Sequence, residues 1–233
     1  LTLGGNDSVG SGTLGSGTSG GVTVNDGAAL DLGGSKVITV LKPLILNGTG
    51  VNNGGALTSF GNSTYSGLVT LGSDTLISGP VVLSNTGTIT GDGKTLTLGG
   101  SSGGTLYSIL GTGSGGLIKQ GNGTWKLYAA NTYSGTTTVN GGSLMIYHAG
   151  ALGSTAAGTT VNTNGTLAFT NSITDVPENL TLNGGKFSNG GNTSLLGNVY
   201  LAVDTTFTNI GSLTISGNIS GPGALIKDSA STM

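Results

Sequence analysis

The stretch GGLIKQGNGTWKLYAANTYSGTTTVNGGSLMI, from Gly115 to Ile146, decides the fold of this chain. Within its short runs, apolar residues recur at every second position, as in Trp125 and Leu127. Gly, Asn or Ser-Gly turn residues close each run. This pattern is typical of short, half-buried β-strands, and no segment of the chain shows a helical period.

The rest of the chain follows the same pattern less strictly. Runs of about four to six residues between glycine-containing turns predict further strands, such as VVLSN, LTLGG and LTLNGG. The Gly/Ser/Thr-rich stretch from Asn6 to Gly21 is expected to be a loop of the same architecture, and a mobile linker is the alternative.

A short cassette of Thr-Val-Asn, turn residues and Leu sets the period, at 138–144, 160–167 and 23–30. Val139 and Val161 are 22 positions apart, and Leu182 follows Val161 by 21. This spacing suits one coil of a solenoid that has three short strands and three turns. We therefore predict an all-β solenoid of about ten coils with roughly 22 residues in each.

A longer repeat is also visible. LILNG at 44–48 resembles LTLNG at 180–184, and GGLIK at 115–119 resembles GALIK at 223–227. If Met233 is read on into Leu1, the second copy continues, with Met233 in the place of Trp125.

We interpret residues 1–233 as a single solenoid segment and as one period of a longer tandem array. Its two divergent half-repeats would be 38–172, and 173–233 continuing into 1–37. We expect either that similar sequence continues beyond both ends or that copies stack end to end. Uncapped solenoid ends expose the core and the strand edges, which favours such stacking.

Composition and charge limit the function classes. Gly accounts for 48 of 233 residues, but it does not occur at every third position and there are only four prolines, which excludes collagen. Seven lysines and no arginine stand against nine acids, for a formal net charge of −2. Such a chain lacks the basic face that nucleic acids require, so we expect no nucleic-acid partner.

Cysteine is absent, so disulfides and thiolate metal sites are excluded. The longest apolar stretch, 37–46, is interrupted by Lys42 and Pro43 and is far shorter than the roughly 20 residues of a membrane helix. We expect no membrane insertion by this segment. No signal peptide is visible, because Leu1 begins within a strand-like run.

Residues with catalytic chemistry are few and scattered. The single histidine, His148, is expected to be a turn residue rather than a catalytic base, and coil spacing can bring Asp26 near Asp31 or Asp175 near Glu178. GGNDSVGSG at 4–12 weakly resembles a calcium-binding turn, and GTGSGG at 111–116 is expected to be a turn rather than a phosphate loop. We expect no catalytic residues, metal site or cofactor.

Four aromatic residues form the main aromatic cluster of the sequence: Trp125, Tyr128, Tyr133 and Tyr147. Exposed, these rings would stack on sugars, which makes them the candidate sugar-binding residues. The alternative, which we favour, is that Trp125 fills the core and the tyrosines pack in turns.

The opening stretch resembles the passenger-associated transport repeat, also called the autotransporter-associated β-strand repeat. The resemblance covers the blocks GGLIK, GNGTWKL, ANTYSG and TTVNGGSL. It implies a right-handed parallel β-helix in a surface-exposed or secreted bacterial protein that is exported across the outer membrane by type V secretion. Ala129 departs from the usual Ser-Gly turn, and the C-terminal copy lacks the Trp and the Asn-Thr-Tyr turn.

Two function classes follow. The first is a non-enzymatic extracellular scaffold: a surface stalk, an adhesin passenger, or a self-associating filament subunit whose partners are copies of itself or neighbouring repeats. The second is a β-helix that binds or cleaves polysaccharide, with surface glycans or host matrix as partners. Carboxylate pairs about 5 to 10 Å apart across a groove, beside exposed aromatics, would favour cleavage.

Overall fold

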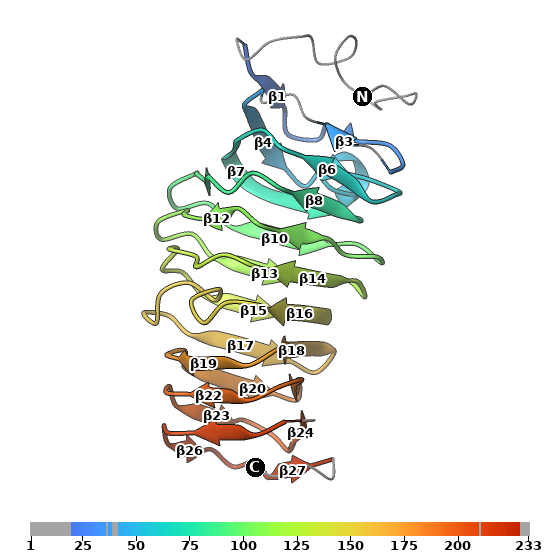
Figure 1. The fold of residues 1–233 in the computed structure, drawn as a ribbon. Coiled ribbons are helices and arrows are strands. Elements are labelled where there is room, and N and C mark those ends of the chain that lie inside the picture. The colour runs from blue at the N-terminus through green and yellow to red at the C-terminus, as the bar shows by residue number, and fades with distance from the viewer. Residues whose placement is uncertain (1–19, 36, 39–41, 210, 229–233) are drawn as a thin grey trace.

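A computed structural model describes residues 20–35, 37–38, 42–209 and 211–228. Within them the chain is a parallel β-solenoid that winds in stacked coils from the N-terminal to the C-terminal end (Figure 1). The predicted all-β fold is therefore confirmed. The calcium-like stretch 4–12, residues 6–19 of the predicted loop and the Met233-to-Leu1 join lie outside the described residues.

The coils have three faces, which we call A, B and C, and each coil contributes one short segment to each face. Face A is built from these strands: β2 (Leu30–Asp31), β5 (Leu57–Thr58), the end of β7 (Val69–Ser78), β10 (Leu96–Gly99), β13 (Leu117–Lys119), β15 (Thr137–Val139), β17 (Thr159–Asn162), β20 (Leu180–Asn183), β23 (Val199–Leu201) and β26 (Ile219–Ser220).

Face B consists of the following strands: β3 (Val37–Ile38), β6 (Ser63–Tyr65), β8 (Val81–Leu83), β11 (Thr105–Leu106), β14 (Thr124–Leu127), β16 (Gly142–Ile146), β18 (Gly165–Phe169), β21 (Lys186–Asn189), β24 (Thr205–Asn209) and β27 (Leu225–Lys227).

Face C begins with β1 (Val22–Val24), β4 (Leu44–Gly48) and the start of β7, and continues with β9 (Thr88–Ile89) and β12 (Ile109–Leu110). Strand pairing on this face resumes at the end of the solenoid with β19 (Ile173–Val176), β22 (Thr193–Leu195) and β25 (Leu213–Ile215). Between β12 and β19 the chain crosses face C in turns, without a named strand.

The predicted coil spacing is confirmed by the register. Val139 pairs with Val161, and Val161 pairs with Leu182, in parallel ladders on face A. Along faces A and B the ten strands make nine steps, and at roughly 4.8 Å a step the rod is about 43 Å long.

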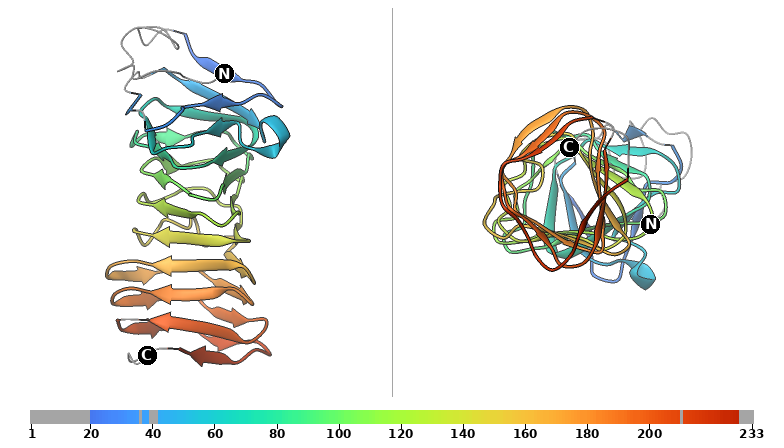
Figure 2. Two further views of the ribbon diagram at one scale, coloured as in Figure 1. Left: turned by 90° about the vertical axis from the view of Figure 1, so that its right-hand side faces the viewer. Right: turned by 90° about the horizontal axis from the view of Figure 1, so that it is seen from below.

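One coil near the N-terminal end is longer than the others. Leu30 pairs with Leu57, 27 positions later, whereas Leu57 pairs with Ile77 after 20. The extra residues form a protruding connection between β4 and β5 that contains η1 (Val51–Asn53), the only helical turn among the described residues. Figure 2 shows this turn standing outside the outline of the coils.

Large apolar side chains fill the interior along the whole rod. Trp125 is completely buried, and its indole Nε1 donates a hydrogen bond to the Gly99 carbonyl at 2.8 Å. Phe169, Phe187 and Phe207 form a column in successive coils of face B, with ring centroids 5.4 and 5.0 Å apart. The alternation of the sequence thus places every second side chain of a strand inside, as with Trp125 and Leu127 of β14.

Some threonines of face A point into the rod. Thr137 and Thr159 are buried in neighbouring coils of face A, where leucines occupy the equivalent positions in β13 and β20. Their hydroxyls are satisfied inside the rod, because Thr159 Oγ1 donates to Glu178 Oε1 at 2.8 Å and Thr137 Oγ1 donates to the Leu152 carbonyl at 3.3 Å.

Asparagines form the hydrogen-bonded ladders that their turn positions predict. Asn162 Nδ2 donates to Asn140 Oδ1 at 2.7 Å, and Asn183 Nδ2 donates to Asn162 Oδ1 at 3.0 Å. The three side chains lie one coil apart at the corner where face A ends. Each amide thus links its coil to the next one.

The long-period repeats do not occupy equivalent places. LIK at 117–119 is β13 on face A, whereas LIK at 225–227 is β27 on face B. Likewise LILNG is β4 on face C, and LTLN is β20 on face A. A strand followed by a glycine turn fits any of the three faces. The similarity between two such motifs therefore does not determine which face each strand occupies. The division into half-repeats stays a prediction.

Candidate functional site

Of the four predicted sugar-binding aromatic residues, two are buried in the structure and two are partly exposed. Trp125 and Tyr133 have no exposed surface. The Tyr133 hydroxyl shares a hydrogen bond with Thr137 Oγ1, and burial raises the pKa of Tyr133 above its ordinary value. Neither ring is accessible, so neither can form part of a sugar platform on this surface.

Tyr128 and Tyr147 are partly exposed and belong to a column that also contains Tyr107. The ring centroids of Tyr107 and Tyr128 are 4.7 Å apart, and those of Tyr128 and Tyr147 are 4.2 Å apart, in stacked geometry. Burial and a hydrogen bond with Tyr147 raise the pKa of Tyr128 to about 12.

The stacking limits what this tyrosine column can bind. Both faces of the Tyr128 ring are covered by its neighbours, so a sugar has access only to the ring edges and to the two outer rings. Sugar binding by Tyr128 and Tyr147 stays a prediction. Tyr107 was missed, although the spacing of 21 and 19 positions between the three tyrosines equals one coil.

The expected acid pairs have dissimilar surroundings. Asp175 is exposed and accepts a hydrogen bond from Ser194 Oγ at 3.3 Å, whereas Glu178 is only 2% exposed. Asp26 and Asp31 line different cavities on the N-terminal coils. His148 lies in an exposed turn, where its Nδ1 accepts the Gly150 N–H at 3.0 Å.

Glu178 is an unusual buried carboxyl group at the corner between faces C and A. Burial raises its pKa to about 7, and the hydrogen bond from Thr159 opposes this shift. The group also raises the pKa of Tyr133 electrostatically. A column of polar side chains, Tyr133, Thr137, Thr159 and Glu178, thus lies inside the rod.

Lys119 is a buried cation held by backbone carbonyls. Its Nζ donates to the carbonyls of Gln120, Gly121 and Gly141 at 2.9, 3.0 and 2.8 Å. Burial lowers its pKa to about 8. Three carbonyls match the three donors of an ammonium group, so the side chain fastens two successive turns together.

Asn131 forms hydrogen bonds to both adjacent coils on face C, where the strands are interrupted. Its Oδ1 accepts the N–H of Leu110 at 2.7 Å, and its Nδ2 donates to the Ala151 carbonyl at 2.5 Å. Its own N–H donates to the Gly150 carbonyl at 2.9 Å. One side chain therefore connects the coil above with the coil below.

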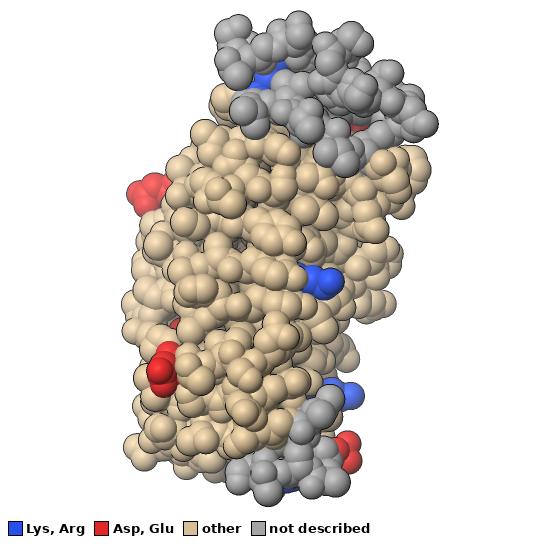
Figure 3. Space-filling view, viewed as in Figure 1, with Lys and Arg blue, Asp and Glu red and all other residues tan. Residues whose placement is uncertain are grey.

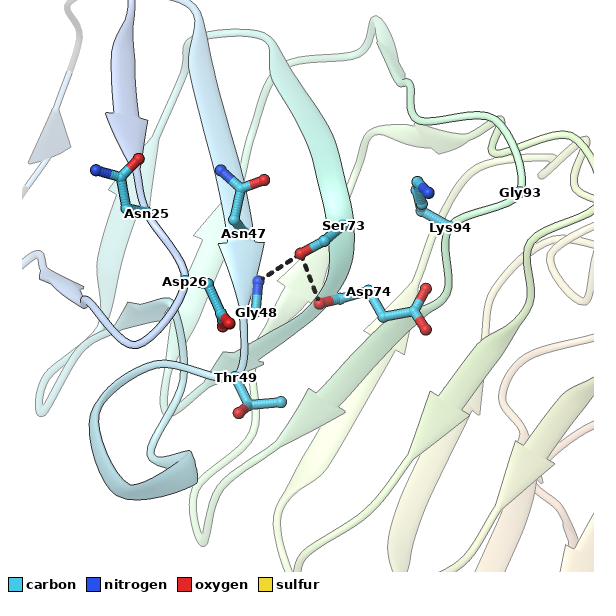
Figure 4. Close-up of a pocket in the computed structure, with 9 residues that line it drawn as sticks. All are labelled: Asn25, Asp26, Asn47, Gly48, Thr49, Ser73, Asp74, Gly93 and Lys94. Carbon is cyan, nitrogen blue, oxygen red and sulfur yellow. Dashed lines mark hydrogen bonds between the residues drawn. The ribbon is translucent and has the colours of Figure 1, made fainter.

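A polar cleft of about 750 Å³ lies at the corner between faces C and A in the N-terminal coils (Figure 4). Asp26 follows β1, Asp74 lies within β7, and Lys94 precedes β10. Ser73 Oγ accepts the Gly48 N–H at 2.8 Å, and Asp74 Oδ1 accepts the Thr95 N–H at 2.8 Å. No aromatic residue is among the described residues that line this cleft, so these residues do not match the arrangement expected of a polysaccharide-cleaving site.

Two further cavities, of about 510 and 400 Å³, adjoin each other on the outside of face A near η1. Asp31, Gly54 and Thr58 line both of them. The second cavity also includes Phe60, the most exposed of the large apolar side chains that the structure describes, at 76%.

The described residues contain neither a metal-binding cluster nor a membrane-spanning helix. No group of three or more His, Cys, Asp or Glu side chains is placed to hold a metal ion. Nor does this part of the chain contain a helix with the length and apolar composition needed to cross a membrane.

Comparison with protein families identifies the segment from β13 to β16, which carries Lys119, Trp125, Asn131 and Tyr133. Residues 117–146 match the family model of the passenger-associated-transport-repeat. The chain thus carries one such transport repeat within a longer parallel solenoid. Neither the curated proteins nor the solved structures gave a match.

The transport repeat and the solenoid together fit a structural role of the autotransporter-passenger type, exposed at a cell surface. Three of the repeat's polar or amphipathic side chains bind backbone groups inside the rod: Lys119, Trp125 and Asn131. These hydrogen bonds link neighbouring coils and turns, so the three side chains have a structural role.

Proposed function

We propose that this chain is a non-enzymatic, extracellular stalk segment of a bacterial surface protein exported across the outer membrane. The observation that carries the proposal is the unbroken stack of parallel coils, with one core from Val24 to Leu213. In a solenoid each coil packs mainly on its neighbours, so the coils stack along one axis. The resulting rod holds the domains at its two ends at a fixed separation.

The outer surface supports this role. The outward positions on face A are largely Thr and Asn, such as Thr138, Thr160 and Thr181. Charged side chains are few and scattered on the side of the rod seen in Figure 3. A surface on which charges are few and scattered suits an exposed spacer.

The stalk is proposed to stack with neighbouring repeats or with copies of itself. The last coil presents Ile219, which pairs with buried Val199, with 48% of its surface exposed, and Leu225, which pairs with buried Thr205, is half-buried. Parallel strands that add to such an edge would bury these side chains. Adhesin and filament functions would both build on this geometry.

Two experiments test the proposal. Purified protein incubated with a panel of plant, bacterial and animal polysaccharides should release no reducing sugar, and release would refute the non-enzymatic role. Electron microscopy over a range of concentrations should show rods whose lengths are multiples of one segment. Single short rods at every concentration would refute end-to-end stacking.

A further inference from the structure

We propose that the groove on the outside of face A, between Val51 and Phe60, binds a neutral saccharide chain. This groove, called here the Asp31 groove, is the pair of adjoining cavities of about 510 and 400 Å³ that share Asp31, Gly54 and Thr58. The inference goes beyond the stalk function, which holds whether or not the groove is occupied.

Phe60 forms one end of the Asp31 groove and is held in place by its surroundings. A Cβ atom on Gly34 would lie 2.6 Å from Phe60 Cε2, so the ring rests directly on the backbone of the preceding coil. The ring is nevertheless 76% exposed. An aromatic ring that is fixed on one side and open to solvent provides an apolar platform for the C–H face of a sugar.

The turn that carries Phe60 is fastened by Ser59. This side chain is 8% exposed, and its Oγ donates to the Gly33 carbonyl at 2.6 Å and accepts the Gly61 N–H at 3.3 Å. Ser63 Oγ lies 3.0 Å from Ser59 Oγ and also donates to the Gly33 carbonyl. The exposed ring therefore sits on a pre-organised turn, which reduces the entropy cost of binding.

Asp31 lies where the two cavities meet and is the one charged residue among the described residues that line them. Its Oδ1 accepts the Gly33 N–H at 2.8 Å, and its Oδ2 has no partner among the described residues. A carboxylate oxygen accepts strong hydrogen bonds from sugar hydroxyls, and the hydroxyls of Thr58, Ser78 and Ser101 line the same surface. One negative charge, with no cation among the described residues that line the groove, favours a neutral glycan over an anionic one.

The groove exists because of the insertion that lengthens this coil. Asn52 and Asn53 have φ values of 50° and 59°, a left-handed conformation that turns the chain sharply after Val51. Val51 is 54% exposed and forms the other end of the groove. In solenoids, insertions into single coils map to loops that often form the binding face.

The test is titration of the intact protein by calorimetry with cellohexaose, maltohexaose and chitohexaose, and with hexagalacturonate as an anionic probe. We expect saturable binding of at least one neutral hexasaccharide and weaker binding of the anionic one. Phe60→Ala should weaken that binding by about tenfold, which is about 1.4 kcal/mol. Asp31→Asn should weaken it by about threefold or more.

Matched variants separate the groove from general effects. Tyr200→Ala removes another exposed aromatic, 46% exposed on the outside of face A in a distant coil, and should leave the affinity within about twofold. Gly34→Ala displaces the ring while keeping Phe60, and should also weaken binding. Circular dichroism and the unfolding midpoint of each variant confirm that the fold is retained.

Three results would overturn the proposal. The first is that no neutral hexasaccharide binds at concentrations up to about 10 mM. The second is that binding is unchanged in both Phe60→Ala and Asp31→Asn. The third is that only the anionic probe binds. These results are independent of the reducing-sugar assay, which tests the stalk function. The groove proposal can therefore fail while the stalk function stands.

Discussion

The side-chain oxygen of Asn131 accepts the backbone N–H of Leu110 at 2.7 Å, across the boundary between two coils. The same amide donates to the carbonyl of Ala151 in the following coil. Face C has no strand at this position, so an amide side chain substitutes for the missing strand pairing. Asn131 is 7% exposed, and loss of its amide would leave two buried backbone groups without partners.

We expect Asn131→Ala to lower the free energy of unfolding by about 2 to 4 kcal/mol, because each orphaned buried group costs roughly 1 to 3 kcal/mol. Urea unfolding followed by circular dichroism measures the change. Asn140→Ala is the control, since Asn140 is an exposed member of the asparagine ladder and its loss should cost less than about 1 kcal/mol. Equal losses in the two variants would contradict the bridging role of Asn131.

Lys119→Met should destabilise the protein by about 2 kcal/mol. The methionine fills a similar volume, but the carbonyls of Gln120, Gly121 and Gly141 lose their ammonium donor. Lys126→Met, on the outer side of β14, should change stability by less than about 0.5 kcal/mol. Chemical unfolding of both variants measures these changes. An unchanged midpoint for Lys119→Met would show that the hydrogen bonds from Lys119 to the three carbonyls do not contribute to stability.

Glu178 should make the stability of the rod depend on pH. Burial raises its pKa to about 7 in the folded protein from about 4.5 in the unfolded chain, so the folded state holds the proton more tightly. The group therefore favours the folded state most at low pH, and this contribution falls as the pH rises from about 4.5 to about 7. Above that range the carboxylate is ionised in both states, and the burial penalty is constant.

The measurement is the unfolding free energy of wild type and Glu178→Gln at several pH values from 4 to 8. Glutamine keeps an acceptor for Thr159 Oγ1 without a charge. We expect the variant to lose the decline between about pH 4.5 and 7 and to be the more stable protein at pH 8. Parallel pH profiles for the two proteins would rule out this effect of Glu178.

The tyrosine column should contribute to stability through stacking. Tyr128 is the middle ring, so Tyr128→Ala removes both contacts and should cost about 1 to 3 kcal/mol, at roughly 0.5 to 1.5 kcal/mol for each pair. Tyr200→Ala removes an exposed tyrosine for which the structure shows no ring partner among the described residues, and should cost less than about 0.5 kcal/mol. Thermal unfolding compares the two, and a larger loss from Tyr200→Ala would contradict the stacking effect.

The coil spacing could be predicted from sequence because it appears in local patterns. Val139, Val161 and Leu182 are inward-facing residues of adjacent strands, and their spacing of 22 and 21 positions is the length of one coil. Turn residues between the strands repeat with the same period, so strand length and coil length are both visible in the chain.

The face that each strand occupies could not be predicted in this way. GGLIK and GALIK are nearly identical, yet their strands lie on faces A and B, because the position around the rod depends on the summed length of all intervening turns. The burial of Thr137 was missed for a related reason, since an inward threonine is acceptable only where a partner such as Leu152 in another turn meets it.

The Asp31 groove could not be predicted from the sequence either. Phe60 does not stand out in the sequence, since it follows an ordinary strand, and Asp31 was considered only as a partner of Asp26. The groove forms because the insertion containing Val51 shifts the pairing of Leu30 to Leu57 and leaves Phe60 against Gly34.

The sequence by itself determined the short strands, the glycine and asparagine turns, the length of a coil and the presence of one passenger-associated transport repeat. These features depend on alternation and turn chemistry within a few residues. Only the tertiary structure decided that Asn131 reaches Leu110 and Ala151, that Glu178 is buried beneath Thr159, and which grooves open on the surface. Those contacts join residues about 20 positions apart, and they form only when the coils stack with the register that the whole chain imposes.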